Sequence, residues 1–594
     1  MPSMIRRLTC LSPLLLLATP GVAREATPPD LARATLPSLA LQPADAGQPD
    51  PLLSAVTDEL ARIQATLAQQ PEPPYWMQLA LVDRRVVQVQ ATHGAAVATS
   101  DTRERLGDVA LRLGDPSLDN THKIRDAGWF SEEPRPQVEL PVGNSNLRAV
   151  RMGLWRAADE TYRSALRRLI KVRTNDAVKV AREDQSADFS DAPVVQDLRA
   201  VRPVKVDAAA WQRAARDASA VLLDYPHVYD SNVTFRLEDD VTLIADTDGT
   251  AIRFQRPQAR VSIWATTVAE DGMELGFYDY VDVSTPGRLP DAAALIEMAH
   301  RVGKQVEDLR EAPLVDPYSG PAILRGRAAA VFFHEILGHR VEGHRQKDED
   351  EGQTLADKVG EEIFPSFLSV HDDPTLFTWE GEELSGYYPY DDEGVAAQRV
   401  DVVEDGVLRG FLMSRAPIED FAVSNGHGRR QPGSAVVARQ GNLVVSASES
   451  VPYEQLRAQL VQQIRDQDKP FGLILDDISG GFTLTGRTTP NSYAVQPVTA
   501  WRVFPDGRPD ELVRGIDMIG TPLVTFQKIV AASDDTQVFN GVCGAESGWV
   551  PVSAIAPDLL VEEVEVQRQA KENDRPPLLP PPGVREGQAT RGAP

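Results

Sequence analysis

The chain has 594 residues, of which 42% are hydrophobic and 25% charged, and its formal net charge is -26. These proportions are those of ordinary folded domains, which argues against a mostly disordered, fibrous or membrane-embedded protein. The length predicts at least two hydrophobic cores. An acidic surface repels phosphate groups, so no nucleic acid is expected as a partner.

The first 23 residues have the pattern of a secretory signal peptide. Arg6 and Arg7 precede a short apolar run, and the small residues Gly21 and Ala23 stand where a signal peptidase cleaves. The sequence therefore predicts export to the periplasm or the medium, with a mature start near Arg24. The choice between the general and the twin-arginine route stays open. No later run is apolar for long enough to cross a bilayer, so no membrane span is expected.

An N-terminal α+β domain is predicted over residues 51–313, after a flexible leader of residues 24–50 that is rich in proline, alanine and aspartate. The spacing of apolar residues predicts helices in this domain, and alternating patterns between turn residues predict strands. The expected helices are residues 52–68, 146–172 and 291–309, and the expected strands lie within residues 76–97 and 233–283.

A second domain, residues 314–566, alternates short apolar runs with turn residues and is predicted to be mostly β. Its expected strands are residues 400–403, 407–413, 472–475 and 492–504, and its expected helices are residues 325–344 and 453–467. The last segment, residues 567–594, is polar and then proline-rich, which predicts a disordered tail. The fold class is thus α+β with two domains, the first of α/β type and the second mostly β.

Two histidines and a glutamate interrupt an apolar helical run in the second domain. They are His334, Glu335 and His339, in an HExxxH pattern. The familiar zinc peptidase signature places its histidines four residues apart, on one face of a helix, with a glutamate beside the first. Here the spacing is five, which on an ideal helix separates the imidazoles by about 140°. A π-bulge would bring them together, and Gly338 supplies the backbone freedom for it.

The competing structural interpretation makes both histidines hydrogen-bonded core residues and Glu335 a surface residue. The chain has only nine histidines, so a pair this close beside a glutamate favours a site. Catalytic zinc usually has three protein ligands, and a third must come from elsewhere. Cys10 is removed with the signal peptide, which leaves Cys543 as the thiol of the exported chain. That thiol is buried and inert, paired between chains, or a metal ligand or nucleophile.

The run around His334 resembles the HExxxH motif of the TldD/PmbA peptidases, also called modulators of DNA gyrase. The likeness covers roughly residues 230–565. It includes the segments 390–394 and 425–430, the loop around Arg439, and Cys543 with the segment that follows it.

This resemblance implies that His334, His339 and Cys543 bind one zinc ion per chain, and that Glu335 activates the water that attacks a peptide bond. It also implies short or unfolded peptides as substrates, and a dimer with a second copy or with a homologue. Some members of the family lack the metal motif, so a non-catalytic partner or binding subunit is the alternative function. Two histidines and a cysteine also bind copper in electron-transfer proteins, an interpretation that leaves Glu335 unexplained.

Five more residues are candidates for substrate binding: Asp391, Asp392, Glu393, Arg429 and Arg430. The three acidic residues suit a second metal or a substrate amine, or they form an acidic turn before a strand. The two arginines suit a bidentate grip on a peptide carboxylate, or they pair with surface acids. His344 is an alternative metal ligand, although the polar stretch after it indicates a solvated loop.

Overall fold

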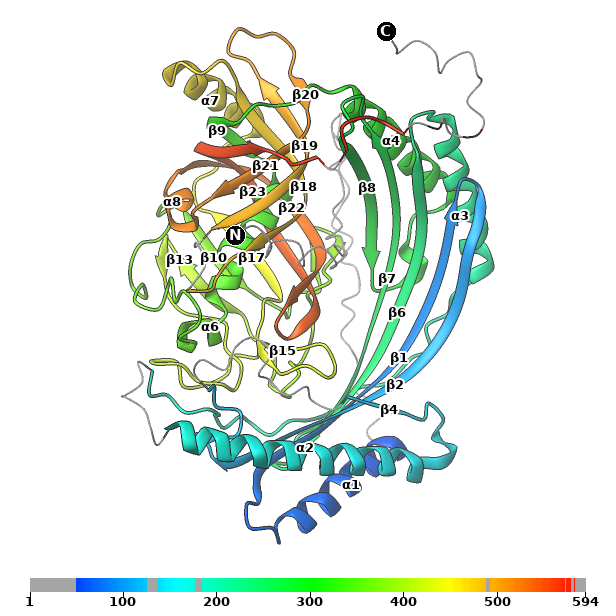
Figure 1. The fold of residues 1–594 in the computed structure, drawn as a ribbon, viewed down its shortest axis with the longest axis vertical. Coiled ribbons are helices and arrows are strands. Elements are labelled where there is room, and N and C mark those ends of the chain that lie inside the picture. The colour runs from blue at the N-terminus through cyan, green and yellow to red at the C-terminus, as the bar shows by residue number, and fades with distance from the viewer. Residues whose placement is uncertain are drawn as a thin grey trace, which may run out of the picture.

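The computed structural model describes residues 50–124, 137–176, 184–487 and 492–571, together with residues 573–577, 579 and 582. The predicted signal peptide, nearly all of the predicted leader and most of the predicted tail lie outside the described residues. The rest of the chain forms two packed bodies, each built on one large sheet (Figure 1). The fold is α+β, as predicted, with a mostly β second body.

The first sheet has eight strands in the order β3-β2-β1-β6-β7-β5, with β4 added beside β2 and β8 beside β7. Its main strands are long and antiparallel, apart from the parallel pairing of β5 with β7. The strands are β1 (Pro74–Thr92), β2 (Ala95–Asp115), β3 (Leu118–Asp119), β4 (Val138–Leu140), β5 (Gln196–Leu198), β6 (Asp230–Asp246), β7 (Ala251–Val268) and β8 (Glu274–Val283).

Four helices cover one face of this sheet, because the side chains on that face are apolar and alternate with polar ones on the other face (Figure 1). They are α1 (Pro51–Leu67), α2 (Leu147–Asp176), α3 (Ala208–Val221) and α4 (Ala292–Glu311). The predictions of α1, α2 and α4 are confirmed. Helix α3 was not predicted, because its buried residues are small, namely Ala215, Ala218 and Ser219. The uncovered, polar face of the sheet is turned toward the second body.

The second sheet has eleven strands in the order β14-β13-β10-β17-β23-β21-β19-β18-β9, with β20 beside β19 and β22 beside β23. Since β23 also pairs with β9, the strands β23, β21, β19, β18 and β9 close into a ring. The strands are β9 (Tyr318–Leu324), β10 (Leu368–Asp372), β13 (Val400–Glu404), β14 (Val407–Leu408), β17 (Asn442–Ala447), β18 (Gly472–Thr483), β19 (Tyr493–Val503), β20 (Glu511–Val513), β21 (Ile516–Gly520), β22 (Ile529–Ala545) and β23 (Gly548–Arg568).

Smaller elements complete this body. Two-stranded ribbons are formed by β11 (Thr378–Trp379) with β12 (Glu382–Glu383), and by β15 (Gly428–Arg429) with β16 (Val437–Ala438). The helices are α5 (Gly326–Ile336), α6 (His344–Lys347), α7 (Tyr453–Asp466) and α8 (Pro522–Gln527). The prediction of α7 is confirmed, whereas α5 is much shorter than the predicted helix of residues 325–344.

Helix α5 is enclosed by the second sheet, and all eleven of its residues are buried. It packs against β23, β18 and β22. Phe332 meets the ring of Tyr493 edge-on, and Phe333 stacks on Phe364. A helix that is apolar on every side requires such an enclosure. The polar residues at its end are therefore held in the protein interior.

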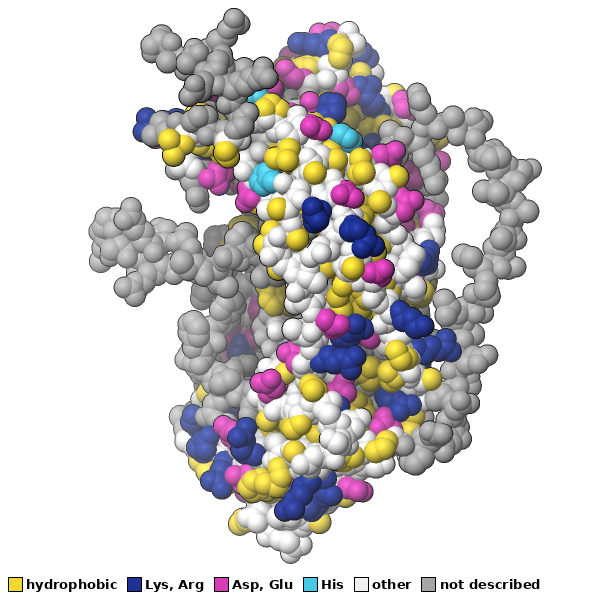
Figure 2. Space-filling view, turned by 90° about the vertical axis from the view of Figure 1, so that its right-hand side faces the viewer, with side chains coloured by type: hydrophobic (Ala, Val, Ile, Leu, Met, Phe, Trp, Pro, Cys, Tyr) yellow, Lys and Arg dark blue, Asp and Glu magenta, His cyan; other side chains and the backbone are white. Residues whose placement is uncertain are grey.

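Within the described residues, no helix combines the length and the apolar character that a membrane crossing requires. Figure 2 shows the face of the molecule that lies to the right in Figure 1, on which acidic and basic side chains are interspersed.

Candidate functional site

The HExxxH residues lie where α5 ends. His334 and Glu335 belong to the last turn of α5, and Leu337 follows as the C-cap. The chain then forms a 3₁₀ turn over Gly338–Val341, which carries His339. The prediction of a π-bulge at this point is wrong. The α-helix stops instead, and the tighter turn changes the direction of His339 so that the five-residue spacing still brings the two imidazoles together.

Gly338 serves a different purpose from the one expected. Its backbone is not in the left-handed region. A Cβ at this position would lie 1.9 Å from Oε1 of Gln440, whose amide Nε2 donates to the carbonyl of His334. The glycine is therefore required because Gln440 occupies the space of a side chain.

Cys543 comes from a distant part of the chain and lies beside both histidines. It is on β22, directly opposite Val550 of β23. Its Sγ is 3.1 Å from Nε2 of His334 and 3.3 Å from Nε2 of His339. All three side chains are buried. The structure thus brings together the three side chains that the sequence analysis proposes as ligands.

These three side chains fit a zinc ion. Bond lengths of about 2.3 Å to sulfur and 2.0–2.1 Å to nitrogen, in tetrahedral geometry, put ligand atoms about 3.5 Å apart. The separations of Cys543 from the histidines are only slightly shorter. Imidazole nitrogen and thiolate sulfur are both zinc ligands, and three protein ligands leave the fourth position of a catalytic site open.

A buried carboxylate orients His339. Glu342 is fully buried and lies 3.2 Å from Nδ1 of His339, which donates to it. This hydrogen bond turns Nε2 toward Cys543 and keeps a proton on Nδ1, so that Nε2 is the nitrogen that would give up its proton to bind a metal. Arg345 donates to the same Glu342 oxygen at 2.9 Å, and Nε of Arg439 is 3.3 Å from the other.

The charges of this group favour the ionised forms of Cys543 and Glu342. Burial opposes ionisation of the Cys543 thiol, but the positive charges of His339, His334 and Arg439 outweigh it and lower the pKa of Cys543 well below its usual value. Burial likewise opposes ionisation of Glu342, yet His339 and Arg345 lower its pKa to about 2. Metal binding requires the thiolate, so the environment stabilises the form of Cys543 that binds.

Glu335 lies next to the three proposed ligands with its carboxylate uncommitted. It is 4% exposed, and within the described part of the chain its carboxylate makes no hydrogen bond. Burial raises its pKa, and the charges of His334 and His339 oppose this rise. Strand β18 passes beside it, where a Cβ on Gly481 would lie 2.9 Å from the Glu335 Cγ. A carboxylate with a raised pKa beside an open position suits a general base.

His344 is not part of this group. It forms an ion pair with Glu546, in the turn between β22 and β23, and Arg345 pairs with the same carboxylate at 2.9 Å. The alternative ligand of the sequence analysis therefore fastens the tip of the hairpin that carries Cys543.

The acidic candidates brace a loop. Asp391 accepts hydrogen bonds from the backbone N–H groups of Glu393, Val395 and Gly428. Asp392 accepts from the N–H of Arg430. Glu393 accepts from the N–H of Arg415. The sequence left open whether these acids bind a metal or a substrate amine, or form an acidic turn. The hydrogen bonds to backbone N–H groups are those of an acidic turn.

The two arginine candidates differ from each other. Arg430 donates to Asp108 of β2 at 2.6 Å, so its charge is used within the protein. Arg429 donates one hydrogen bond, from Nη1 to the carbonyl of Gln440 at 2.7 Å, and stacks over the ring of Tyr388.

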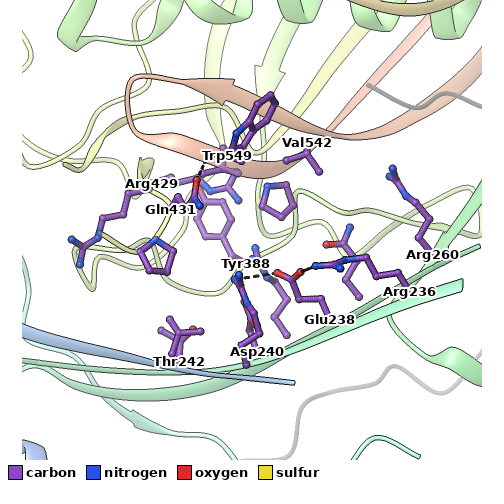
Figure 3. Close-up of a pocket in the computed structure, with 18 of the residues that line it drawn as sticks. Arg236, Glu238, Asp240, Thr242, Arg260, Tyr388, Arg429, Gln431, Val542 and Trp549 are labelled. Carbon is purple, nitrogen blue, oxygen red and sulfur yellow. Dashed lines mark hydrogen bonds and ion pairs between the residues drawn. The ribbon is translucent and has the colours of Figure 1, made fainter. Parts of the chain in front are cut away.

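A cavity of about 750 Å³ lies between the polar face of the first sheet and the second body. Strands β6 and β7 line one side, and the β22–β23 hairpin with Val542 and Trp549 lines the other (Figure 3). Because side chains alternate along a strand, Val542 and Cys543 point to opposite faces of the hairpin. The hairpin therefore separates the cavity from the three proposed ligands, and Asp391, Asp392, Arg429 and Arg430 lie on the cavity side.

Four residues that the sequence analysis did not name as site residues hold the group in place. They are Glu342, Arg345, Arg439 and Gln440. For Glu342 a signal was present, because it follows His339 by three residues and so shares a side of a helical turn. Nothing in the local sequence places Arg439 or Gln440 beside α5.

Comparison with known proteins gives one family model and several relatives. Residues 317–568 match the C-terminal domain of the PmbA/TldA metallopeptidases. A "Metalloprotease TldD homolog" of Haemophilus influenzae is 28% identical over 341 residues, which are 54% of this chain and 64% of that protein. A "Zinc metalloprotease TldD homolog" of Saccharolobus solfataricus is 24% identical over 41% of this chain and 51% of its own. The chain thus spans less than two thirds of each of these two relatives.

The fold is also similar to a solved structure. The crystal structure of TldE from Thermococcus kodakarensis superposes with a TM-score of 0.57 over 86% of this chain and 100% of that chain, at 14% sequence identity. At this identity the likeness concerns the fold alone.

The contact between Gly338 and Gln440 leads to a test. We expect Gly338→Ala to lower the free energy of unfolding by about 1–3 kcal/mol, the usual cost of overpacking, because Gln440 is itself buried and has no room to move. Gly287→Ala is the matched control, since a Cβ there meets nothing within 4 Å. Denaturant unfolding of the metal-free variants measures both. Equal stability of the two would show that the space beside Gly338 is not limiting.

Proposed function

Because the chain belongs to the TldD/PmbA family through its residues 317–568, we propose that it is a zinc-dependent peptidase that hydrolyses short or unfolded peptides. The observation that carries this proposal is the buried group of His334, His339 and Cys543 with the uncommitted carboxylate of Glu335 beside it. One zinc ion per chain corresponds to the single group of this kind found among the described residues.

The chain's own residues have separate tasks in this reaction. His334, His339 and Cys543 would hold the ion, and Glu342 keeps the proton of His339 on Nδ1. A zinc ion in such a set lowers the pKa of water and polarises a carbonyl group. Glu335 accepts the proton of the attacking water and then returns it to the leaving amine, which is the work of a general base and general acid.

The alternative is a non-catalytic partner or binding subunit in a complex of two homologues. The structural likeness to TldE of Thermococcus kodakarensis is compatible with both assignments, because it reports the fold. A subunit without catalysis would have no need of Glu335 as an uncommitted buried carboxylate, and burying such a group is costly. A copper electron-transfer site would likewise give the Glu335 carboxylate no chemical role. We therefore propose the peptidase, assembled with a second copy or with a homologue.

Glu335 gives the direct test of the mechanism. We expect Glu335→Gln to keep the zinc and the fold while lowering turnover of unfolded peptides by roughly 10²- to 10⁴-fold, because the amide does not accept the proton. Peptide hydrolysis and zinc content are measured on the same preparations. Glu404→Gln, at an exposed acid that ends β13 and pairs with Arg409, is the control that should leave both unchanged. Turnover near the wild-type level in Glu335→Gln would contradict the proposed role.

Export stays a proposal, supported by the N-terminal sequence pattern. N-terminal sequencing of the protein recovered from the periplasm or medium is expected to begin near Arg24. A chain that retains Met1 in the cytoplasm, or that carries a lipid on Cys10, would be the contrary result.

A further inference from the structure

The end of α5 presents backbone carbonyl groups that need partners from outside the helix. The last turn of any α-helix has such carbonyls, and here the whole turn is buried. Gln440 donates to the carbonyl of His334, as described above. Arg340, in the 3₁₀ turn that follows, donates from Nη1 to the carbonyls of Glu335 and Ile336 at 3.4 and 3.0 Å. The guanidinium of Arg340 therefore holds the backbone at the proposed general base.

Arg340 also contacts strand β18. Its Nη1 donates to Oγ1 of Thr483 at 2.7 Å, and its Nη2 donates to the carbonyl of Leu484 at 3.3 Å. The side chain is buried, and a guanidinium carries its donors in a fixed planar arrangement, so that one arginine can hold two segments at once. Arg340 thus joins the end of α5 to the end of a strand that lies 143 residues away in the chain.

This end of β18 is paired along one edge. Strand β18 pairs with β19 as far as Thr483, which stands opposite Tyr493. Along its other edge it pairs with β9 over residues 473–475. Among the described residues, no strand pairs with that second edge between residues 476 and 483. The hydrogen bonds from Arg340 therefore fasten this part of β18 to α5.

The fastened part of β18 touches the side chain of Glu335. Because side chains alternate along a strand, Gly481 and Thr483 face α5, while Phe482 between them points away and is 54% exposed. A Cβ on Gly481 would lie 2.9 Å from Cγ of Glu335. The Glu335 carboxylate makes no hydrogen bond within the described chain, so the backbone of β18 limits where this side chain can move on that side.

A general base works only when it is correctly placed, since a displacement of about 1 Å can cost roughly 100-fold in rate. We propose that Arg340 is a positioning residue for Glu335. It holds the Glu335 backbone directly and, through Thr483 and Leu484, holds β18 beside the Glu335 side chain. This inference rests on the proposed peptidase function. It assigns Arg340 to the base and not to the ion, because the proposed ligands have their own supports in Glu342 and Gln440.

The contact between Arg340 and Thr483 gives the test. Thr483→Val removes the hydroxyl and nearly keeps the shape, whereas Thr483→Ser keeps the hydroxyl. In the full-length, zinc-containing protein we expect Thr483→Val to lower kcat for an unfolded peptide roughly 10-fold, with KM and zinc content unchanged. Thr483→Ser is expected to turn over close to the wild-type rate. Arg340→Lys loses the planar fork and is expected to lower kcat roughly 100-fold.

Thr267→Val is the matched control for the loss of a hydroxyl. Thr267 lies on β7 and is buried, and its Oγ1 makes no hydrogen bond within the described residues. This change removes no contact of the kind tested, so kcat and zinc content are expected to stay at the wild-type values.

Amide hydrogen exchange of the metal-free proteins measures the fastening of β18 without turnover. Peptides from residues 477–487 are expected to exchange faster in Thr483→Val than in wild type or Thr483→Ser, because this end of the strand opens more often. Unchanged exchange in Thr483→Val would overturn the inference.

The kinetic results have equally definite consequences. If Arg340 only closed the end of the helix, Thr483→Val would lower the stability and leave kcat of the folded protein unchanged, which would overturn the inference. Equal losses in Thr483→Val and Thr483→Ser, or loss of zinc from Thr483→Val, would also overturn it. Hydrolysis by wild type with an unchanged kcat in Thr483→Val refutes this inference alone. A zinc-containing wild-type protein that hydrolyses no unfolded peptide refutes the proposed function, and the inference with it.

Discussion

The rest of the structure depends on the burial of two imidazoles, a thiol and two carboxylates at the end of one helix. Ionised groups in the interior are stable only when opposite charges and hydrogen bonds surround them. Here Glu342 lies between His339 and the arginines Arg345 and Arg439, and Arg439 also donates to the carbonyl of Cys543 at 2.9 Å. The enclosure of α5 by the second sheet makes this compensation necessary.

The same requirement explains why distant segments converge at α5. Cys543 arrives on β22, Arg439 and Gln440 on the chain just before β17, and Gly481 on β18. Each of these segments is fixed by strand pairing with the second sheet. A rigid sheet is a precise support for a site, because its strands hold side chains more tightly than loops do. The hairpin β22–β23 additionally divides the metal side from the cavity side.

The sequence predicted the parts of the fold that depend on local periodicity. The helices α1, α2, α4 and α7 follow from apolar spacing, as does the mostly β character of the second body. The sequence did not predict the 3₁₀ turn after α5, because the choice between a bulge and an early helix end depends on Gln440, about a hundred residues away in the chain.

The residues of the candidate site likewise fall into those that the sequence predicted and those that it did not. His334, Glu335 and His339 were recognisable from their spacing, and the proposal of Cys543 drew on the family resemblance as well as on its being the last thiol. The sequence did not predict the different contacts of Arg429 and Arg430, since Asp108, the partner of Arg430, lies in the other body. The local sequence does not show which of two adjacent arginines forms an ion pair with an acid from a distant segment.

The proposed metal centre depends most on Cys543 being a ligand together with the two histidines. X-ray absorption at the zinc edge of the full-length protein, purified without added metal, measures this directly. We expect one sulfur at about 2.3 Å and nitrogen scatterers at about 2.0–2.1 Å with the pattern of two imidazoles. A zinc shell without sulfur, or a protein that retains no zinc on purification, would contradict it.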